Sequence, residues 1–436
     1  MKNKILTLVV CLSLVVAVVC FVACSGTNKD SASANAYNRE VDYSYVTADL
    51  TGKTLKVGAI LVGDETEGYT EAHMKGMTAA KQYLEGKGAT ITIINKKKVP
   101  EGPECATACS ETIAQGANVV ITNSYGHQFN VGEVVAANPN VTFVCMTGDL
   151  AAGSGYSNLK NAFTKVYESR YVSGVVAGLK LKELVDAGKL TAANYDSNNN
   201  IKIGYVGAYN YAEVVSGYTA FYLGLKSVVN NIVMKVQYTN EWFEYDKEYQ
   251  TAKALIADGC VIIGQHADSE GAPTACQEEL ENGKVVYSVG YNVDMLKAAE
   301  DASLTSSTNT WAAYYTYLFY QLLTEGEVKT DWAEGYSTGA VGITTINDSA
   351  FSTNIKPQIK SVVDDIVAGN IKVFDCSKFT VNNEHLTTYT GAYGMNGAEC
   401  LKTENGVTFF DESTLRSAPY FDIRIDGITE VGAASV

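Results

Sequence analysis

Short apolar runs that alternate with longer helical patterns are the feature of this sequence that most restricts its fold. Between residues 55 and 146, apolar runs at 55–62, 90–95, 118–122 and 141–146 are separated by helical patterns at 70–85, 103–115 and 127–137. The runs are continuous, as in Val119-Val120-Ile121, which is typical of strands buried on both faces of a parallel sheet. This part of the chain therefore predicts repeated β-α-β units.

The same pattern starts again in the second part of the chain. A helix is predicted over 167–184, and after a polar loop at 192–200 come strands at 201–206, 232–238, 261–263 and 285–289, with helices at 212–228, 246–257 and 271–281. We expect Asp246 to cap the helix over 246–257 and Gly259 to end it. The sequence therefore predicts an α/β protein with two doubly wound lobes.

The N-terminus has the pattern of a secretory signal. Two lysines precede an apolar stretch over 5–23, and the chain turns polar after Cys24. Phe21-Val22-Ala23-Cys24 resembles the lipobox of bacterial lipoproteins, in which the cysteine receives a lipid; an uncleaved membrane anchor is the alternative, because the stretch is nearly long enough to span a bilayer. We predict a signal peptide over 1–23 and a flexible tether over 24–54 that is lipid-anchored through Cys24 at the extracytoplasmic face of the cell membrane.

Charge and cysteine content restrict the partners of the chain. The formal net charge is −15 at pH 7, and removal of residues 1–23 makes it more negative, which disfavours nucleic acid. The seven cysteines beyond Cys24 cannot all pair, and most lie in apolar patterns, so we expect buried thiols rather than a disulfide framework. The four histidines are scattered and Cys105 and Cys109 lack a second ligand pair, so no metal site is predicted.

The loops that follow the predicted strands are where a site is expected, because ligands of doubly wound folds bind beyond the carboxyl ends of the strands. Most of these loops combine an aromatic with a polar side chain, as at 63–69, 123–126, 208–211, 240–243, 265–269 and 290–294. Rings that stack on a flat molecule, beside amides and carboxylates for its edge, favour a planar heterocycle over an ion or a peptide. The 28 tyrosines of the chain account for part of this pattern by composition alone.

Several short motifs within residues 56–348 carry a family resemblance. They include Gly68-Tyr69-Thr70-Glu71-Ala72-His73, Pro100-Glu101-Gly102-Pro103, Tyr167-Glu168-Ser169-Arg170-Tyr171, Trp242-Phe243, Gln265-His266-Ala267-Asp268-Ser269 and Gly290-Tyr291. These motifs resemble the basic membrane protein family of importer-associated lipoproteins, whose characterised members bind purine nucleosides or bases. The chain beyond Val373 matches the family less well.

The resemblance implies a type I periplasmic-binding fold, in which two lobes joined by several chain crossings close over the ligand. It places residues 55–165 and about 291–345 in the N-terminal lobe. The C-terminal lobe then consists of residues 166–290 and about 346–436.

The resemblance also implies which residues bind the ligand. Ten candidates follow from it: Tyr69, Asn123, Tyr125, Glu213, Trp242, Phe243, His266, Asp268, Tyr291 and Asp294. Tyr69 and Trp242 are the main candidates for ring stacking. Asp268 and Asp294 would accept hydrogen bonds from ring N–H, amino or ribose hydroxyl groups, or else cap helices. His266 would meet the ligand edge or serve structure, and the helical stripe of His73 predicts that His73 packs in the core.

Together these features predict a monomeric binding protein without cofactor or catalytic activity, which captures a purine nucleobase or nucleoside and delivers it to ABC transporter permease subunits. A riboflavin-like heterocycle or a sugar as ligand, and a ligand-sensing receptor as function, stay open. A secreted hydrolase is the weakest alternative. Gly335-Tyr336-Ser337-Thr338-Gly339 matches the nucleophile-elbow pattern, but a β-like run rather than a helix follows it.

Overall fold

A computed structural model describes residues 36–432 of the chain. The predicted signal peptide over 1–23, the lipid-anchor residue Cys24 and the first part of the predicted tether lie outside the described residues. Within the described residues, no helix combines the length and the apolar character that a membrane crossing requires.

The first sheet is parallel throughout and forms the centre of what we call the first lobe. Its strand order is β11-β5-β4-β3-β1-β2. The strands are β1 (Thr54–Ile60), β2 (Thr90–Lys96), β3 (Val119–Thr122), β4 (Thr142–Met146), β5 (Leu159–Thr164) and β11 (Asp331–Glu334). All four residues of β3 are buried, as the continuous apolar run predicted.

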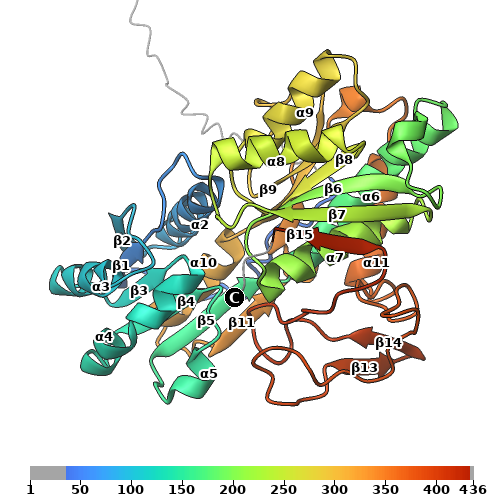
Figure 1. The fold of residues 1–436 in the computed structure, drawn as a ribbon. Coiled ribbons are helices and arrows are strands. Elements are labelled where there is room, and N and C mark those ends of the chain that lie inside the picture. Colours follow the sequence, from blue (N-terminus) through green and yellow to red (C-terminus); the bar gives the residue numbers. More distant parts are fainter. Residues whose placement is uncertain (1–35, 433–436) are drawn as a thin grey trace, which may run out of the picture. The chain divides into compact units, whose positions relative to one another are not determined.

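The second sheet forms the centre of the second lobe and has the order β12-β10-β9-β8-β6-β7-β15. Its strands are β6 (Ile201–Gly207), β7 (Ile232–Tyr238), β8 (Ile262–Gln265), β9 (Tyr287–Tyr291), β10 (Ser303–Asn309), β12 (Val341–Ile343) and β15 (Ile428–Val431). Only the pairing of β12 with β10 is antiparallel among the described strands of this sheet. Two sheets of parallel strands flanked by helices confirm the predicted α/β class (Figure 1).

Helices connect the strands in both lobes. They are α2 (Gly68–Glu85), α3 (Glu104–Ala114), α4 (Gly132–Ala137), α5 (Ala151–Ser154), α6 (Val166–Asp186), α7 (Ala212–Lys226), α8 (Tyr245–Ala257), α9 (Gly271–Glu281), α10 (Ala312–Leu323) and α11 (Lys356–Val367), with short 3-10 helices at Tyr125–Asn130, Ala192–Asn194, Tyr336–Thr338 and Asp348–Ala350. The cap of α8 is Glu244, whose side chain accepts from Lys247 N, so Asp246 lies in the first turn instead of capping as predicted. Gly259 follows the helix with φ +99°, a conformation that suits glycine.

The chain passes between the lobes from β5 to α6, from β10 to α10 and from β11 to β12, since α10 packs on α2 and β1 of the first lobe. Residues 291–345 were predicted to lie in the N-terminal lobe, whereas β10 and β12 pair in the second sheet. The reason is strand pairing: β10 continues the second sheet alongside β9, and β12 returns antiparallel to β10.

Residues 36–54 are packed on the protein, so the prediction of a flexible tether up to residue 54 is wrong for this part. Tyr37 is buried, and its hydroxyl lies 3.0 Å from both Thr344 O and Ile346 N. Val46 and Leu50 are buried in the apolar core of the first lobe. The segment lacks helical or strand periodicity, which is why the sequence pattern alone did not reveal its packing.

The C-terminal part of the chain lies mainly on the second lobe. Helix α11 packs against α6, and β15 adds to the sheet beside β7 (Figure 1). Between them lies a hairpin of β13 (Leu401–Glu404) and β14 (Val407–Phe410). Its turn residues Asn405 and Gly406 both have positive φ, the conformation that Asn-Gly hairpin turns require.

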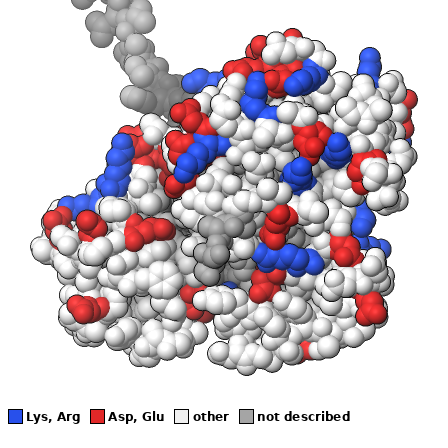
Figure 2. Space-filling view, viewed as in Figure 1, with Lys and Arg blue, Asp and Glu red and all other residues white. Residues whose placement is uncertain are grey.

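Two side-chain predictions about the core are confirmed. The cysteines Cys105, Cys109, Cys145, Cys260, Cys276, Cys376 and Cys400 are all buried free thiols. His73 is fully buried, stacks on Trp311 with ring centroids 4.3 Å apart, and lies 2.6 Å from the Tyr315 hydroxyl through Nδ1. On the face shown in Figure 2, basic and acidic side chains lie side by side, as expected of a surface with many ion pairs.

Candidate ligand-binding cleft

A cavity of about 550 Å³ lies between the two lobes, where the carboxyl ends of strands from both sheets meet. Its walls come from the loops after β1, β2, β3 and β4 of the first lobe, from the loops after β6, β7 and β8 of the second, and from the end of β9. This volume is within the range of small-molecule sites. Nine of the ten candidate residues line the cavity: Tyr69, Asn123, Tyr125, Glu213, Trp242, Phe243, His266, Asp268 and Tyr291.

Asp294 is the candidate that the structure does not bring to the cavity. Its side chain is exposed, and Oδ1 accepts a hydrogen bond from Leu296 N at 2.9 Å. This local turn satisfies a backbone donor two residues along the chain, a common use of aspartate. No helix begins at Asp294, so the structure shows neither a contact with the cavity nor the helix cap that was the alternative for this residue.

The first-lobe wall is held in place by buried polar side chains. Asn123 accepts from Val62 N at 2.8 Å and donates to the Thr70 hydroxyl at 3.1 Å. Glu67 caps α2 by accepting from Tyr69 N and Thr70 N at 3.1 and 3.0 Å. These contacts fix the start of α2, and with it the Tyr69 ring, against the end of β1.

Two buried carboxyl groups face the cavity from opposite lobes. Asp268 accepts from Asn292 Nδ2 at 2.7 Å, and burial first, then the nearby Glu67 charge, raises the pKa of Asp268 well above its usual range. Burial likewise raises the pKa of Glu67. Carboxyls that retain protons can donate to a ring nitrogen or carbonyl as well as accept from N–H groups. The prediction missed Glu67, although its position just before the α2 pattern was a signal for a cap.

The imidazole of His266 contacts the carboxylate of Glu213, so it does not present both ring nitrogens to the cavity. Its Nε2 lies 3.2 Å from Glu213 Oε1, and a side chain at Gly217 of α7 would lie 3.0 Å from Nδ1. Burial, and then the charge of Arg170, lowers the pKa of His266 to about 4. The imidazole is therefore neutral at pH 7, and its Nε2–H donates to Glu213, which lines the cavity.

Arg170 is buried next to Tyr291, which lines the cavity. Its guanidinium carbon is 3.6 Å from the centroid of the Tyr291 ring, and Nη1 donates to Gln265 O at 2.6 Å. The side chain is 2% exposed. A cation held over a ring in a dry site fixes the orientation of that ring, so Arg170 positions Tyr291 at the back of the cavity.

Aromatic rings form a continuous group across the cleft. Tyr209 stacks on Tyr211 at 5.4 Å and meets Trp242 edge-on at 5.0 Å, while Tyr125 of the first lobe lies 5.5 Å from Tyr211. Trp242 and Tyr209 line the cavity. Tyr209 was not among the candidates, although it belongs to one of the aromatic loops that the sequence singled out. Phe243 is 42% exposed at the rim.

Ser337, the serine of the elbow-like pattern, is exposed on a 3-10 turn that is followed by β12 rather than by a helix. This differs from the strand–turn–helix that exposes a nucleophile. Among the side chains of residues 36–432, no group of three His, Cys, Asp or Glu is placed to hold a metal ion.

Two α/β lobes with a cavity between the carboxyl ends of their strands define a solute-binding protein of the type I periplasmic-binding fold. A crystal structure of an ABC transporter solute-binding protein from Aeropyrum pernix K1 has this fold and superposes with a TM-score of 0.58 at 12% identity, covering 76% of this chain and 94% of that one. The sequence model of the PnrA-like ABC transporter substrate-binding proteins matches residues 56–376. The chain belongs to this family.

Two named relatives extend the comparison. A purine-binding protein of Brucella abortus (strain 2308) is 30% identical over 262 residues, which is 60% of this chain and 67% of that protein. A Haloferax volcanii protein with the provisional name ABC transporter glucose-binding protein is 28% identical over 272 residues, 62% of either chain. The chain thus spans under two thirds of the haloarchaeal relative. The members of this family are substrate-binding components of ABC transporters rather than enzymes. They bind their solutes at the extracytoplasmic side of the membrane.

Proposed function

We propose that this protein binds a purine nucleobase or nucleoside in the cavity between its lobes and delivers it to the permease subunits of an ABC importer. The proposal includes a signal peptide over 1–23, a lipid anchor on Cys24 and a monomeric state. The observation that supports the purine ligand is the combination of aromatic faces with buried carboxyl groups in one cavity.

The chemistry of the cavity suits a purine. Trp242 and Tyr209 offer rings that can stack on a flat heterocycle. Asp268 and Glu67 are buried carboxyls that can both accept from ring N–H or amino groups and donate to ring nitrogens, because their raised pKa values favour the protonated form. The name of the Brucella abortus relative supports the same ligand class.

A sugar is the second candidate ligand. The provisional name of the Haloferax volcanii relative favours glucose, and tyrosine faces beside carboxylates also suit hydroxyl-rich molecules. Riboflavin-like heterocycles are the third class to compare.

The test is ligand-induced stabilisation of the purified protein. Adenine, guanine, adenosine, guanosine, riboflavin and glucose are added separately, and the thermal unfolding midpoint is recorded. A ligand at about 100 times its dissociation constant stabilises the folded state by about 2.7 kcal/mol. Stabilisation by the purines alone supports the proposal; stabilisation by glucose alone contradicts it.

A tryptophan variant locates the site. Trp242→Ala removes a stacking face, and loss of base–aromatic stacking weakens binding by about 1–3 kcal/mol, so the dissociation constant for the best purine should rise about ten-fold. Tyr156→Ala is the matched control, because Tyr156 is an exposed aromatic residue away from the cavity. Unchanged affinity in Trp242→Ala, measured by calorimetry, would move the site elsewhere.

A further inference from the structure

Residues 377–432, which we call the C-terminal segment, lie beyond the family match at residue 376 and are firmly attached to the second lobe. Strand β15 pairs with β7. Glu430 accepts from the hydroxyls of Tyr218 and Tyr238 at 2.8 and 2.5 Å and from Arg424 Nε at 3.0 Å. Phe421 stacks on Phe374 at 4.2 Å within the apolar core of that lobe. Apolar burial and sheet pairing make the segment part of the second lobe.

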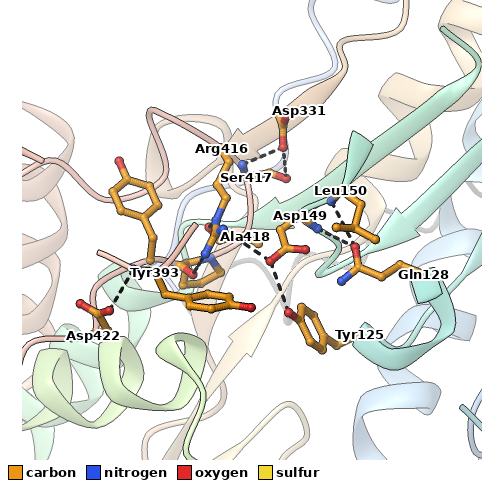
Figure 3. Close-up of polar contacts among 12 residues, drawn as sticks. Tyr125, Gln128, Asp149, Leu150, Asp331, Tyr393, Arg416, Ser417, Ala418 and Asp422 are labelled. Atoms are coloured by element: carbon orange, nitrogen blue, oxygen red, sulfur yellow. Dashed lines mark hydrogen bonds and ion pairs between the residues drawn. The ribbon is translucent and has the colours of Figure 1, made fainter. Parts of the chain in front are cut away.

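The same segment reaches the first lobe through polar contacts. Arg416 Nη1 lies 3.4 Å from Asp149 Oδ2, and Ser417 donates to Asp331 Oδ1 from its backbone N at 2.9 Å and its hydroxyl at 2.8 Å. Asp149 follows β4 and Asp331 begins β11, both in the first sheet. Figure 3 shows both carboxylates close to the loop that carries Arg416 and Ser417.

Asp149 connects Arg416 to the cleft. The oxygen that faces Arg416 also accepts from the Tyr125 hydroxyl at 3.3 Å (Figure 3). Burial, and then the Asp149 charge, raises the pKa of Tyr125, so the hydroxyl remains a donor throughout the physiological range. Tyr125 lines the main cavity and also an adjoining cavity of about 290 Å³, and Arg416 is among the residues that line this second cavity. The Tyr125 ring therefore stands at the junction of the two cavities.

Arg416 is itself held by its own segment. Its Nε donates to Ala418 O and its Nη2 to Pro419 O, both at 3.2 Å, which leaves Nη1 directed at Asp149. The side chains of Arg416 and Asp149 are each 9% exposed. At this burial a carboxylate depends on its cation, because water no longer compensates its charge.

We propose that Arg416 is a positioning residue of the ligand cleft: it holds Asp149, and Asp149 holds the Tyr125 ring against the ligand. A segment outside the family match then sets part of the shape of the binding site in this chain. The contact also joins the two lobes beside the ligand, so it forms fully only when the lobes are together. The inference rests on the proposed function only for the choice of ligand in the test.

A double-mutant cycle tests the pathway through Tyr125. The dissociation constants of adenosine and guanosine are measured by calorimetry for the full-length protein and for Arg416→Ala, Tyr125→Phe and the double variant. Each single change should weaken binding about five-fold, and the double variant should bind about as weakly as Tyr125→Phe alone, since coupled residues are not additive. Asp149→Asn, which removes the same ion pair without leaving a cavity, should match Arg416→Ala.

A structural role alone would not give this non-additivity. If Arg416→Ala weakens binding equally with and without the Tyr125 hydroxyl, or leaves it unchanged, the proposal is overturned. Arg416→Lys keeps the charge and should restore part of the affinity. Arg39→Ala is the control, because it removes an ion pair with Asp364 that is more than 40% exposed on both sides.

A second measurement needs no ligand and so separates this inference from the proposed function. Hydrogen–deuterium exchange of peptides over residues 123–130 and 147–150 should rise in Arg416→Ala and stay unchanged in Arg39→Ala. If no purine binds the unaltered protein, the proposed function fails and exchange alone decides the inference. If a purine binds but exchange in these loops is unaltered by Arg416→Ala, the inference fails and the function stands.

Discussion

Buried carboxyl groups recur in this protein, and Glu412 of the C-terminal segment shows their consequence most clearly. Its two oxygens accept from Tyr420 N at 2.7 Å and Phe421 N at 3.0 Å, and the residue is 3% exposed. Burial raises its pKa from 4.5 to about 7, against the lowering effect of these hydrogen bonds. The group therefore binds its proton more tightly in the folded chain than in the unfolded chain.

We predict that the stabilising contribution of Glu412 is lost as the pH rises from about 4.5 to about 7. In this window the unfolded state has lost the Glu412 proton while the folded state still holds it, so the contribution is full below pH 4.5 and gone above pH 7. Its size is at most about 3 kcal/mol. Urea unfolding of the protein and of Glu412→Gln at pH 5 and pH 8 measures it.

The variant should show a smaller loss of stability between the two pH values than the unaltered protein. Glu248, whose pKa burial raises to about 7, contributes in the same direction and remains in the variant. Glu384→Gln changes an exposed glutamate of the same segment and serves as control. An equal loss in all three proteins would show that Glu412 does not titrate in this range.

The residues that line the cavity were largely predictable one by one, because in a doubly wound fold the loops after the strands converge. The sequence could not show how the pKa values of these residues are shifted. The low pKa of His266 comes from burial and then from Arg170, almost a hundred positions away, and the raised pKa of Asp268 comes from burial and then from Glu67 in the other lobe. Asp294 has the residue type and loop position of a ligand contact, yet its carboxylate accepts a hydrogen bond from the backbone N–H of Leu296.

At the scale of elements, continuous apolar runs predicted β1 to β4 and β6 to β9 but not β5, β10 or β11. The pattern finds only strands that are apolar in composition, and β10 is a buried run of mainly Ser and Thr. The same criterion failed for β15, whose four residues are half-buried or exposed at the sheet edge. It also failed for residues 36–54, which are buried without periodicity. Strand order decided the lobe of β10 and β12, and order is set by pairing partners that local pattern does not reveal.

Helices α6 and α7 pack closely through two glycines. A Cβ on Gly174 of α6 would overlap the carbonyl oxygen of Phe221, and one on Gly224 of α7 would overlap that of Tyr171. Both obstacles are backbone atoms, so a side chain at either position would push the helices apart. This contact positions Arg170 and Gly217, which support His266 and Tyr291 in the cleft.

We therefore predict that Gly224→Ala destabilises the protein by about 1–3 kcal/mol, the usual effect of overpacking. Gly153→Ala is the matched control, because a Cβ at this helical position meets no atom within 4 Å, and alanine there should be neutral or stabilising by about 0.5 kcal/mol. Denaturant unfolding of both variants gives the comparison. A Gly224→Ala protein as stable as the Gly153→Ala protein would refute close packing of α6 on α7.

At the scale of the molecule, both ends of the described chain join the lobes. The C-terminal segment does so through Arg416 and Ser417. At the other end, Tyr37 lies in the apolar core of the second lobe, whereas Val46 and Leu50 lie in that of the first. Asn38 adds two hydrogen bonds to the backbone of Ile343, at 2.7 and 3.0 Å. Residues 36–54 are thus a structural part of both lobes.

We predict that a chain beginning at residue 55 is much less stable than one beginning at residue 36. The loss of three buried side chains, Tyr37, Val46 and Leu50, removes on the order of 5 kcal/mol of apolar burial. Scanning calorimetry of the two chains should show a clearly lower midpoint for the shorter one. If that chain does not fold, Leu50→Ala in the longer chain replaces it and should cost about 2–5 kcal/mol, because Leu50 is fully buried. Equal midpoints would instead mean that residues 36–54 rest on the lobes without stabilising them, as the tether prediction held.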